Sequence, residues 1–391
     1  MTRVRLFFLL VSAALVLPIL TGTLLGAAER EQAPREDSFY KYLSVFSEVL
    51  THVRQAYVEA PEVEMLMAGA LDGTTDALDP FSIYVPARHV ESYQKARAIG
   101  RLHSGLELLK ERGVAYVVSA EKGSPAQAAG VKAGDLVSEI GGRSTRLMPL
   151  WEVQELLAAA PGTKIELELI RLGEPQQVAF ELRRFDNPPA VLERVEGTAL
   201  LRIPAFDAET PAQVRAALGP LGAERQLLVD LRGVGGGEVE AAYEVAKLFA
   251  SGELGALLQK GEKTAGFTGD DAPLWQGKIV VLVDRGTLGP AEVLATVLRQ
   301  RAAAELVGEP TFGHAGRPAE VELSSRGRLF FTDAFYTGPD GTAIDDGLQP
   351  DVRVDERSRT FLEKDTPIEE LILRRGLRHL RGEDEEAKAA A

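Results

Sequence analysis

The hydrophobic pattern divides the chain into segments with different periods. Between residues 38 and 72, apolar side chains recur every three or four positions, which predicts helices because this spacing places them on one helical face. From 101 to 184, short runs such as VAYVVSA and KIELELIR alternate apolar with polar residues, which predicts half-buried strands. Within them, MPLWEVQELLAAA predicts an amphipathic helix. The pattern therefore separates an N-terminal helical region, 38–100, from a compact β module, 101–184.

After a Pro-containing linker at 186–189, residues 190–355 alternate apolar strands with amphipathic helices. The predicted strands are ALLRI, QLLVDLR, KIVVLVD, AELVG and FFTDAF, and PAEVLATVLRQRA is one of the predicted helices. Such alternation predicts a parallel or mixed sheet with helices on its faces. Residues 356–391 read as a helical, charged C-terminal tail. The expected fold class is therefore α/β (α+β).

The N-terminus has the residue pattern of a targeting signal. Two Arg in MTRVR precede LFFLLVSAALVLPILTGTLLG, which contains no charged residue, and the small residues Gly26-Ala27-Ala28 follow as a candidate cleavage site. Residues 6–28 are also long enough for an uncleaved anchor in the cytoplasmic membrane. We expect residues 1–28 to be a signal peptide or membrane anchor. Either one places the rest of the chain outside the cytoplasm, in the periplasm.

Composition excludes several kinds of chemistry. The 391-residue chain has no Cys and a formal net charge of −14, so thiolate chemistry and disulfides are excluded and a nucleic-acid partner is not expected. Its five His lack the spacing of a zinc-binding helix, and GVGGGE after QLLVDLR lacks the patterns of phosphate- and dinucleotide-binding loops. We expect no metal and no cofactor. Asp230 and Arg232, at the end of that strand, are expected to form an ion pair or to serve the structure.

Residues 104–142 resemble a PDZ domain. A Gly-apolar loop precedes a strand, and GSPAQAAGVKAGDLVSEIGG then matches the small-residue run of that family. In PDZ domains the edge of this strand accepts a peptide as an added strand, and backbone N–H groups of the loop hold the terminal carboxylate. The resemblance implies binding of protein C-termini or extended peptides. The residues that it implies are Ser104, Gly105, Leu106, Glu107 and Leu108.

The motifs on either side resemble the C-terminal processing (tail-specific) serine proteases, over residues 40–355. They are LDPFSIYV before the PDZ-like segment, and VDLRGVGGGE, VLVDRGTLGPAEVLATVL, VGEPTFGHAG and GLQPDV after it. The resemblance implies a PDZ domain inserted into or preceding a crotonase-like core with a mixed sheet. It also implies a Ser nucleophile, a Lys general base and a Gln that steadies the Lys. The Gly-rich loop, here Gly235, Gly236 and Gly237, corresponds to the oxyanion loop of that family.

Three chemical positions depart from the family pattern. Glu292 and the helix after it fix the register of TLGPAE against Ser-Ala-Ser-x-Ser-Glu, which places Gly289 at the nucleophile. In TFGHAGRP, set against Thr-Phe-Gly-Lys-Gly-x-x-Gln, His314 stands at the Lys and Pro318 at the Gln. Pro290 also lacks the N–H that the residue after the nucleophile supplies as an oxyanion donor. We therefore expect a catalytically degenerate homologue.

Other functions stay open. Thr287 is the hydroxyl residue of the nucleophile turn and His314 a candidate base for it, which would make the chain an active serine-type or Thr-type endopeptidase with unorthodox residues. Thr287 lies two residues from the aligned nucleophile, and a misplacement of about 1 Å can lower a rate on the order of a hundredfold. An inert structural subunit is a third hypothesis. The favoured one is an adaptor or regulator whose further partner is an active processing protease or a membrane-associated protein.

Overall fold

The computed structural model describes residues 35–355 except positions 112, 147, 223 and 271, together with residue 363 and residues 366–383. The expected signal peptide or anchor, residues 1–28, and the end of the tail lie outside the described residues. Within the described part of the chain, none of the helices is both long and apolar enough to cross a membrane. The described chain divides into two compact units between Gly69 and Ala70.

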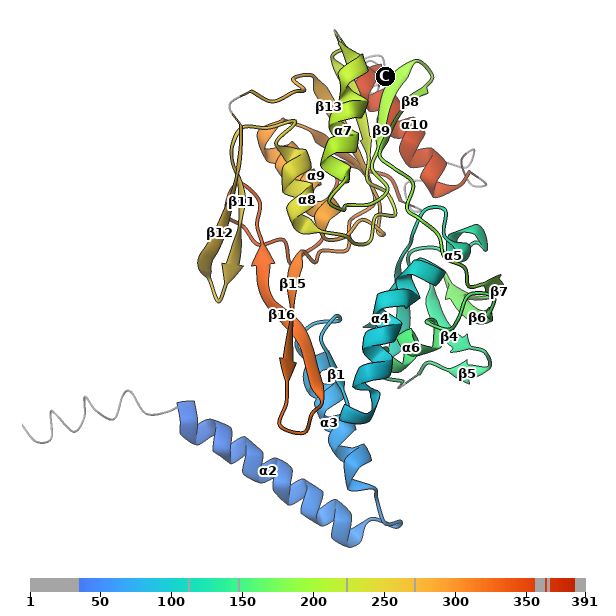
Figure 1. Ribbon diagram of the computed structural model, residues 1–391, viewed down its shortest axis with the longest axis vertical. Helices are drawn as coiled ribbons and strands as arrows, with labels where there is room; N and C mark the ends of the chain where they lie inside the picture. The colour runs from blue at the N-terminus through green and yellow to red at the C-terminus, as the bar shows by residue number, and fades with distance from the viewer. Residues whose placement is uncertain are drawn as a thin grey trace, which may run out of the picture. The chain divides into compact units, whose positions relative to one another are not determined.

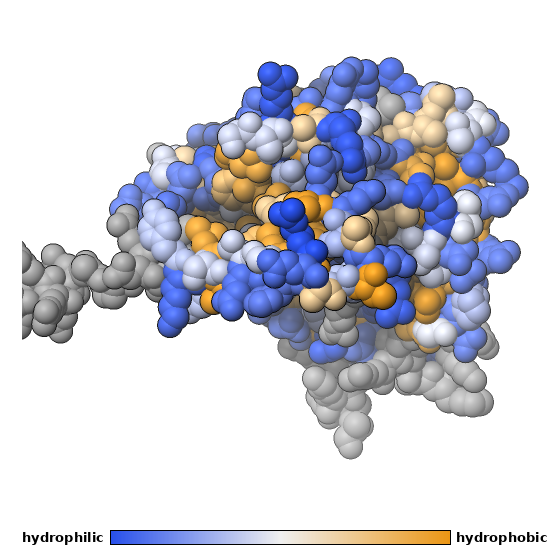
Figure 2. Space-filling model, turned by 90° about the horizontal axis from the view of Figure 1, so that it is seen from below, coloured by the Kyte–Doolittle hydropathy of each residue, from blue (hydrophilic) through white to orange (hydrophobic). Residues whose placement is uncertain are grey.

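The first unit contains helix α2, Arg35–Ala56, and the beginning of α3, Val63–Asp76. The helical spacing of this region therefore forms helices, as predicted. Tyr42 and Val49 of α2 are exposed although they belong to its apolar pattern. Figure 2 shows that the face seen from below presents hydrophobic residues among hydrophilic ones.

The core of the second unit is a six-stranded mixed sheet with the strand order β17–β14–β13–β10–β9–β8. Figure 1 labels three of these strands, β8, β9 and β13. The parallel strands are β9 (Thr198–Arg202), β10 (Gln226–Asp230), β13 (Lys278–Val283), β14 (Glu305–Gly308) and β17 (Val352–Arg353), and β8 (Val191–Val195) runs antiparallel to β9. Strands buried on both faces give continuous apolar runs. ALLRI, QLLVDLR, KIVVLVD and AELVG all lie in this sheet, and the predicted mixed sheet is confirmed.

Helices cover both faces of the mixed sheet, because successive residues of a strand point to opposite sides. The helices are α7 (Thr210–Leu218), α8 (Val239–Ala246) and α9 (Pro290–Arg301) on one face and α10 (Ile368–Arg381) on the other. Leu227 and Val229 pack in the cluster that holds α7 to α9, whereas Leu228 packs with α10. Gly376 allows α10 to lie close to the sheet, since a Cβ there would lie 2.4 Å from Leu282.

A second, antiparallel sheet has the order β1–β16–β11–β12, with β15 also paired to β16. Its strands are β1 (Ile83–Val85), β11 (Gly252–Gln259), β12 (Glu262–Gly269), β15 (Gly316–Glu322) and β16 (Arg328–Tyr336). FFTDAF, expected among the strands of the mixed sheet, lies in β16 instead. The physical reason is its half-buried pattern, which suits an antiparallel sheet with one solvated face.

The segment that resembles a PDZ domain forms its own antiparallel sheet of order β2–β3–β4–β6–β7, with β5 paired to β4. The elements are β2 (Leu106–Glu111), β3 (Val114–Ala120), α5 (Pro125–Ala128), β4 (Leu136–Ile140), β5 (Arg143–Ser144), α6 (Leu150–Leu156), β6 (Lys164–Arg171) and β7 (Glu174–Glu181). Helix α4, Val90–Ser104, leads into it. Since β1 comes before this sheet and pairs with β16 after it, as in Ile83 with Phe330, the segment is inserted into the core.

Candidate functional site

The turn between β13 and α9 bends sharply at Gly289, the residue that precedes the first turn of α9. Gly289 has φ 59° and ψ −112°, and Pro290 is the first residue of the helix. A side chain in such a conformation costs of order 1–3 kcal/mol in strain, and strained strand-to-helix turns of this kind hold nucleophiles in hydrolases. A Cβ at Gly289 would have space, because its nearest neighbour is the carbonyl oxygen of His314 at 3.7 Å. The turn therefore has a strained backbone, and a glycine stands at the position predicted for the nucleophile.

The carboxylate of Glu292 joins this turn to the loop that carries His314. Its Oε2 accepts hydrogen bonds from the N–H groups of Gly289 and His314, both at 3.0 Å. Its Oε1 accepts the N–H of Gly313 at 2.6 Å and the hydroxyl of Thr311. Burial raises the pKa of Glu292, and these four hydrogen bonds oppose the rise. Glu292, which set the alignment of this segment with the family motif, thus also holds the Gly289 turn and the His314 loop together.

The ring of His314 lies among aromatic side chains. It stacks on Phe81 with centroids 4.3 Å apart and meets Phe335 edge-on at 5.5 Å. Its Nε2 is 3.2 Å from the hydroxyl oxygen of Thr332 on β16. Burial lowers the pKa of His314, and nearby Asp carboxylates offset this only in part. Burial therefore favours the neutral form of the ring, in which one nitrogen can accept a hydrogen bond.

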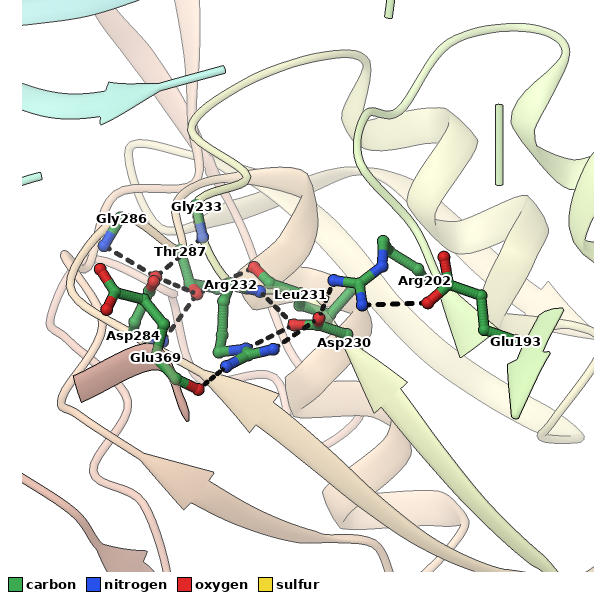
Figure 3. Close-up of polar contacts among 10 residues, drawn as sticks. All are labelled: Glu193, Arg202, Asp230, Leu231, Arg232, Gly233, Asp284, Gly286, Thr287 and Glu369. Atoms are coloured by element: carbon green, nitrogen blue, oxygen red, sulfur yellow. Dashed lines mark hydrogen bonds and ion pairs between the residues drawn. The ribbon is translucent and has the colours of Figure 1, made fainter. Parts of the chain in front are cut away.

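The hydroxyl of Thr287 has other partners than His314. It is fully buried and lies 3.0 Å from the carbonyl oxygen of Leu231, to which it donates, and 3.2 Å from Oδ1 of Asp284. It also accepts the N–H of Asp284 at 3.0 Å (Figure 3). Thr287 thereby ties the end of β13 to the end of β10. Among the described residues, the hydroxyl within hydrogen-bond distance of His314 is that of Thr332.

Pro318 lies on β15 directly opposite Thr332 of β16, at a bulge next to Arg317. Its ring offers no hydrogen-bonding group to the His314 loop. Arg317 forms a bidentate pair with Asp333, at 2.8 and 2.7 Å. Thr332 therefore lies between Pro318, its strand partner, and His314, its hydrogen-bond neighbour. The sequence analysis did not single out Thr332, because its position beside His314 follows from the pairing of β15 with β16.

Known protein families match both domains of this architecture. Residues 197–354 match the family described as Peptidase family S41, and residues 116–171 match a PDZ domain. The chain carries an S41 peptidase domain and a PDZ domain. It is homologous to C-terminal processing proteases, as the motifs predicted.

Two curated relatives are similar over most of their length. The carboxy-terminal-processing protease of Bartonella bacilliformis is 28% identical over 351 residues, covering 86% of this chain and 80% of the relative. The carboxy-terminal processing protease CtpA of Bacillus subtilis is 27% identical over 368 residues, covering 90% and 78%. Among solved structures, the photosystem II D1 C-terminal processing protease has a TM-score of 0.65 at 24% identity, covering 78% of this chain and 86% of that one. The last likeness confirms the fold.

The PDZ domain lies directly on the Gly-rich loop of the S41 domain. A Cβ at Gly235 would lie 1.7 Å from Oγ of Ser119 on β3, and one at Gly237 would lie 2.4 Å from the carbonyl oxygen of Phe206. Gly236 and Gly237 line a hollow of about 680 Å³. Glycine is thus required here for close packing. Oγ of Ser119 is buried with no hydrogen-bond partner among the described residues.

Apolar side chains extend the contact between the PDZ and S41 domains as far as the turn at Gly289. Leu288, the residue before Gly289, clusters with Leu109 of β2 and Val118 of β3, and Phe312 packs against them. The PDZ sheet therefore covers both the Gly-rich loop and the turn at Gly289.

An ion-pair network holds the ends of the parallel strands, as Figure 3 shows. Asp230 is buried and pairs with Arg232 at 2.7 Å and with Arg202. Burial alone would raise the pKa of Asp230, but the two guanidinium groups outweigh it and hold this pKa below its usual value. Arg232 also donates to the backbone carbonyl oxygen of Glu369 in α10. The predicted ion pair is present, and it serves the structure.

The residues predicted to bind peptide lie at one groove of the PDZ domain. Ser104, Leu106, Glu107 and Leu108 line a hollow of about 260 Å³. Gly105 has φ +74°, and a Cβ there would lie 2.0 Å from Cβ of Ser124, so only glycine fits.

The opposite walls of this groove come from residues that sequence reasoning missed. They are Gln154 and Leu157 of the α6 segment and Ala96 and Arg97 of α4. Arg97 extends over the ring of Phe330 on β16, with its guanidinium carbon 5.2 Å from the ring centroid. A helix outside the matched PDZ residues therefore completes the groove. The amphipathic spacing of α6 was visible in the sequence, but nothing in it placed α4 beside α6.

Proposed function

We propose that this chain is a catalytically degenerate homologue of the C-terminal processing peptidases. It binds protein C-termini or extended peptides through its PDZ groove, outside the cytoplasm, as an adaptor or regulator. The observation that carries the proposal is the turn at Gly289. It retains the sharp backbone, the helix start and the clamp by Glu292, yet the position that would present the nucleophile has no side chain.

Two further observations support the loss of catalysis. Pro290 has no N–H to donate to an oxyanion beside the nucleophile position. Burial favours the neutral form of His314, and the hydroxyl that lies 3.2 Å from its Nε2 belongs to Thr332 on β16 and not to the turn at Gly289. A general base must reach the proton that it removes, at roughly 2.6–3.2 Å between heavy atoms.

Peptide binding is supported by the position of β2 at the end of the PDZ sheet. β2 pairs with β3 on one side, and within the described sheet its other side has no strand. An extended peptide can add there and receive backbone hydrogen bonds. The hollow beside β2 is lined by Leu106 and Leu108, which provide an apolar surface for its side chains.

The test of catalysis compares the purified chain with an active C-terminal processing protease on an unstructured protein. We expect cleavage by the active protease and none by this chain, read by gel and by mass spectrometry of the products. Peptide binding to the chain, measured by fluorescence anisotropy, should nevertheless be detectable. Cleavage that disappears in His314→Ala would overturn the proposal.

A working endopeptidase is the second candidate, and the contact between His314 and Thr332 favours it. A neutral imidazole at 3.2 Å from a hydroxyl is a possible base and nucleophile pair. If the chain cleaves protein, Thr332→Val and Thr287→Val decide between the two hydroxyls. Both changes keep the shape of the side chain and remove the oxygen.

The extracytoplasmic location rests on the sequence of residues 1–28. Fractionation of bacterial cells that express the full chain should place it in the periplasm or the membrane, and recovery in the cytoplasm would contradict this. N-terminal sequencing of the recovered protein decides between cleavage after Ala28 and retention as an anchor. Co-purification from the same fractions tests for a processing protease or a membrane-associated protein as partner.

A further inference from the structure

A cleft of about 550 Å³ lies between the PDZ domain and the carboxyl ends of the parallel strands of the S41 domain. Arg202 ends β9 and Asp230 ends β10, while Asp284 and Glu309 directly follow β13 and β14. All four residues line the cleft, and so do residues 130–135 of the PDZ domain. Open α/β sheets bind ligands in crevices outside the carboxyl ends of their strands. Among the described residues, none lines both this cleft and the peptide groove.

The walls of the cleft come from both domains. Lys132 of the PDZ domain pairs with Glu369 of α10 at 3.0 Å, which ties the two domains together at this place. Val131 and Leu172 of the PDZ segment and Ile368 of α10 add apolar surface to the lining. The cleft is therefore a space between two joined domains, with room for a ligand that has an apolar body.

The cleft is lined by more basic than acidic side chains, although the whole chain has a formal net charge of −14. Its five acidic residues are Asp135, Asp230, Asp284, Glu309 and Glu369, and its six basic residues are Lys122, Lys132, Arg171, Arg202, Arg232 and Arg285. Five of the basic side chains form ion pairs with these acidic residues, and Figure 3 shows two of them, Arg202 and Arg232, on either side of Asp230. The sixth is Lys122.

Lys122, in the segment between β3 and α5, is exposed to solvent and lines the cleft. Within the described part of the chain, no acceptor takes a hydrogen bond from its ammonium group and no carboxylate pairs with it. Partial desolvation lowers the pKa of Lys122, and the guanidinium groups of Arg202 and Arg232 lower it further, while Asp230 opposes them. An unpaired ammonium group close to two guanidinium groups attracts an anion.

We propose that this cleft binds a small carboxylate, whose charge pairs with Lys122 and whose apolar body lies against Val131 and Ile368. One unpaired cation matches a singly charged anion. A doubly charged phosphate group would be repelled more strongly by the five acidic side chains of the lining. Since Lys122 belongs to the PDZ domain and Arg202 to the S41 domain, the bound carboxylate also offsets a repulsion between the two domains.

The experiment uses the full chain, because both domains line the cleft. The probe is 4-fluorobenzoate, and its Kd is measured from the broadening of its fluorine resonance in NMR spectra. We expect saturable binding to wild type and about tenfold weaker binding to Lys122→Gln, which loses a charge-assisted hydrogen bond. Lys122→Arg keeps the charge and should retain binding. The uncharged 4-fluorobenzamide should bind no better to wild type than to Lys122→Gln.

A matched control is Lys164→Gln on β6, which removes an exposed Lys from the same domain and should leave the Kd unchanged. The same Kd for wild type and Lys122→Gln would overturn the inference. Inorganic phosphate that displaces the probe at a lower concentration than acetate would contradict the choice of a carboxylate.

Two further measurements identify where the probe binds and which kind of molecule supplies the carboxylate. Arg97→Met alters the peptide groove and not the cleft. A loss of probe binding in Arg97→Met, with none in Lys122→Gln, would place the probe in the peptide groove and overturn the inference. Displacement of the probe by a hexapeptide with a free carboxylate, and not by its amidated form, would assign the cleft to a peptide terminus and contradict a small-molecule ligand. Displacement by neither form supports the small molecule.

Discussion

The turn at Gly289 and the PDZ groove differ in how their buried polar atoms are paired. At the turn, the carboxylate of Glu292 accepts four hydrogen bonds and the hydroxyl of Thr287 is held between Leu231 and Asp284. In the groove, Oε1 of Gln154 has no described partner. Polar groups whose bonds are all made within the chain stabilise it, whereas an unpaired buried group is suited to a ligand. The two sites thus differ in that the polar atoms of the turn are paired within the chain, whereas the groove keeps one buried acceptor unpaired.

The substitution with the largest expected effect removes the carboxylate that holds the Gly289 turn in place. Glu292→Ala leaves three backbone N–H groups and one hydroxyl without their acceptor in the interior. We expect the free energy of unfolding to fall by about 3–5 kcal/mol, because each buried donor left unpaired costs about 1–3 kcal/mol. Urea denaturation followed by circular dichroism measures it, with the exposed Glu174→Ala on β7 as control. A loss below about 1 kcal/mol would mean that the clamp is not structural.

The next effect concerns Asp284, whose pKa is raised from 3.8 to about 6, mainly by burial. A raised pKa means that the folded chain binds the proton more tightly than the unfolded chain. The contribution of this carboxyl group to stability is therefore full below pH 3.8 and is lost as the pH rises through about 6.

Asp284→Asn keeps an oxygen to accept the N–H groups of Gly233 and Gly286 and removes the charge. The variant should gain stability over wild type as the pH rises from about 4 to 7, by up to about 3 kcal/mol. Denaturation curves at a series of pH values measure the difference. A constant difference across this range would contradict the assignment.

A third substitution tests the contact between the PDZ and S41 domains at Gly235 and Ser119. Gly235→Ala directs a methyl group at Oγ of Ser119, and overpacking of this kind costs about 1–3 kcal/mol. Faster limited proteolysis and a lower Tm are the expected readouts. Adding Ser119→Gly should restore both, since it removes the clashing atoms, and a double mutant no better than the single one would place the strain elsewhere.

The smallest effect concerns the groove wall from α4. Arg97→Met keeps the length of the side chain over Phe330 and removes its charge. Peptides with a free carboxylate should bind up to about fivefold more weakly, because exposed charge pairs contribute little. The loss should shrink in high salt. An amidated peptide that suffers the same loss would show that Arg97 acts through packing and not through charge.

The sequence predicted the buried parallel strands and their helices well, because their signal is local. β10 and β13 are continuous apolar runs, and α9 begins at a Pro and keeps an apolar face. The hairpin of β11 and β12 was missed, since β12 is exposed along most of its length and both strands contain Gly. Such strands are fixed by their partners and not by their own composition.

The sequence by itself determined which side chains stand at the site: Gly289 and Pro290 in the turn, and His314 in the loop that follows β14. It also determined the family, since the motifs are short and contiguous. Only the tertiary structure decided that Thr332 lies beside His314, that Ser119 lies on Gly235 and that α4 completes the peptide groove. These contacts join segments far apart in the chain, so they depend on how the sheets pair and pack. No local pattern of residues encodes them.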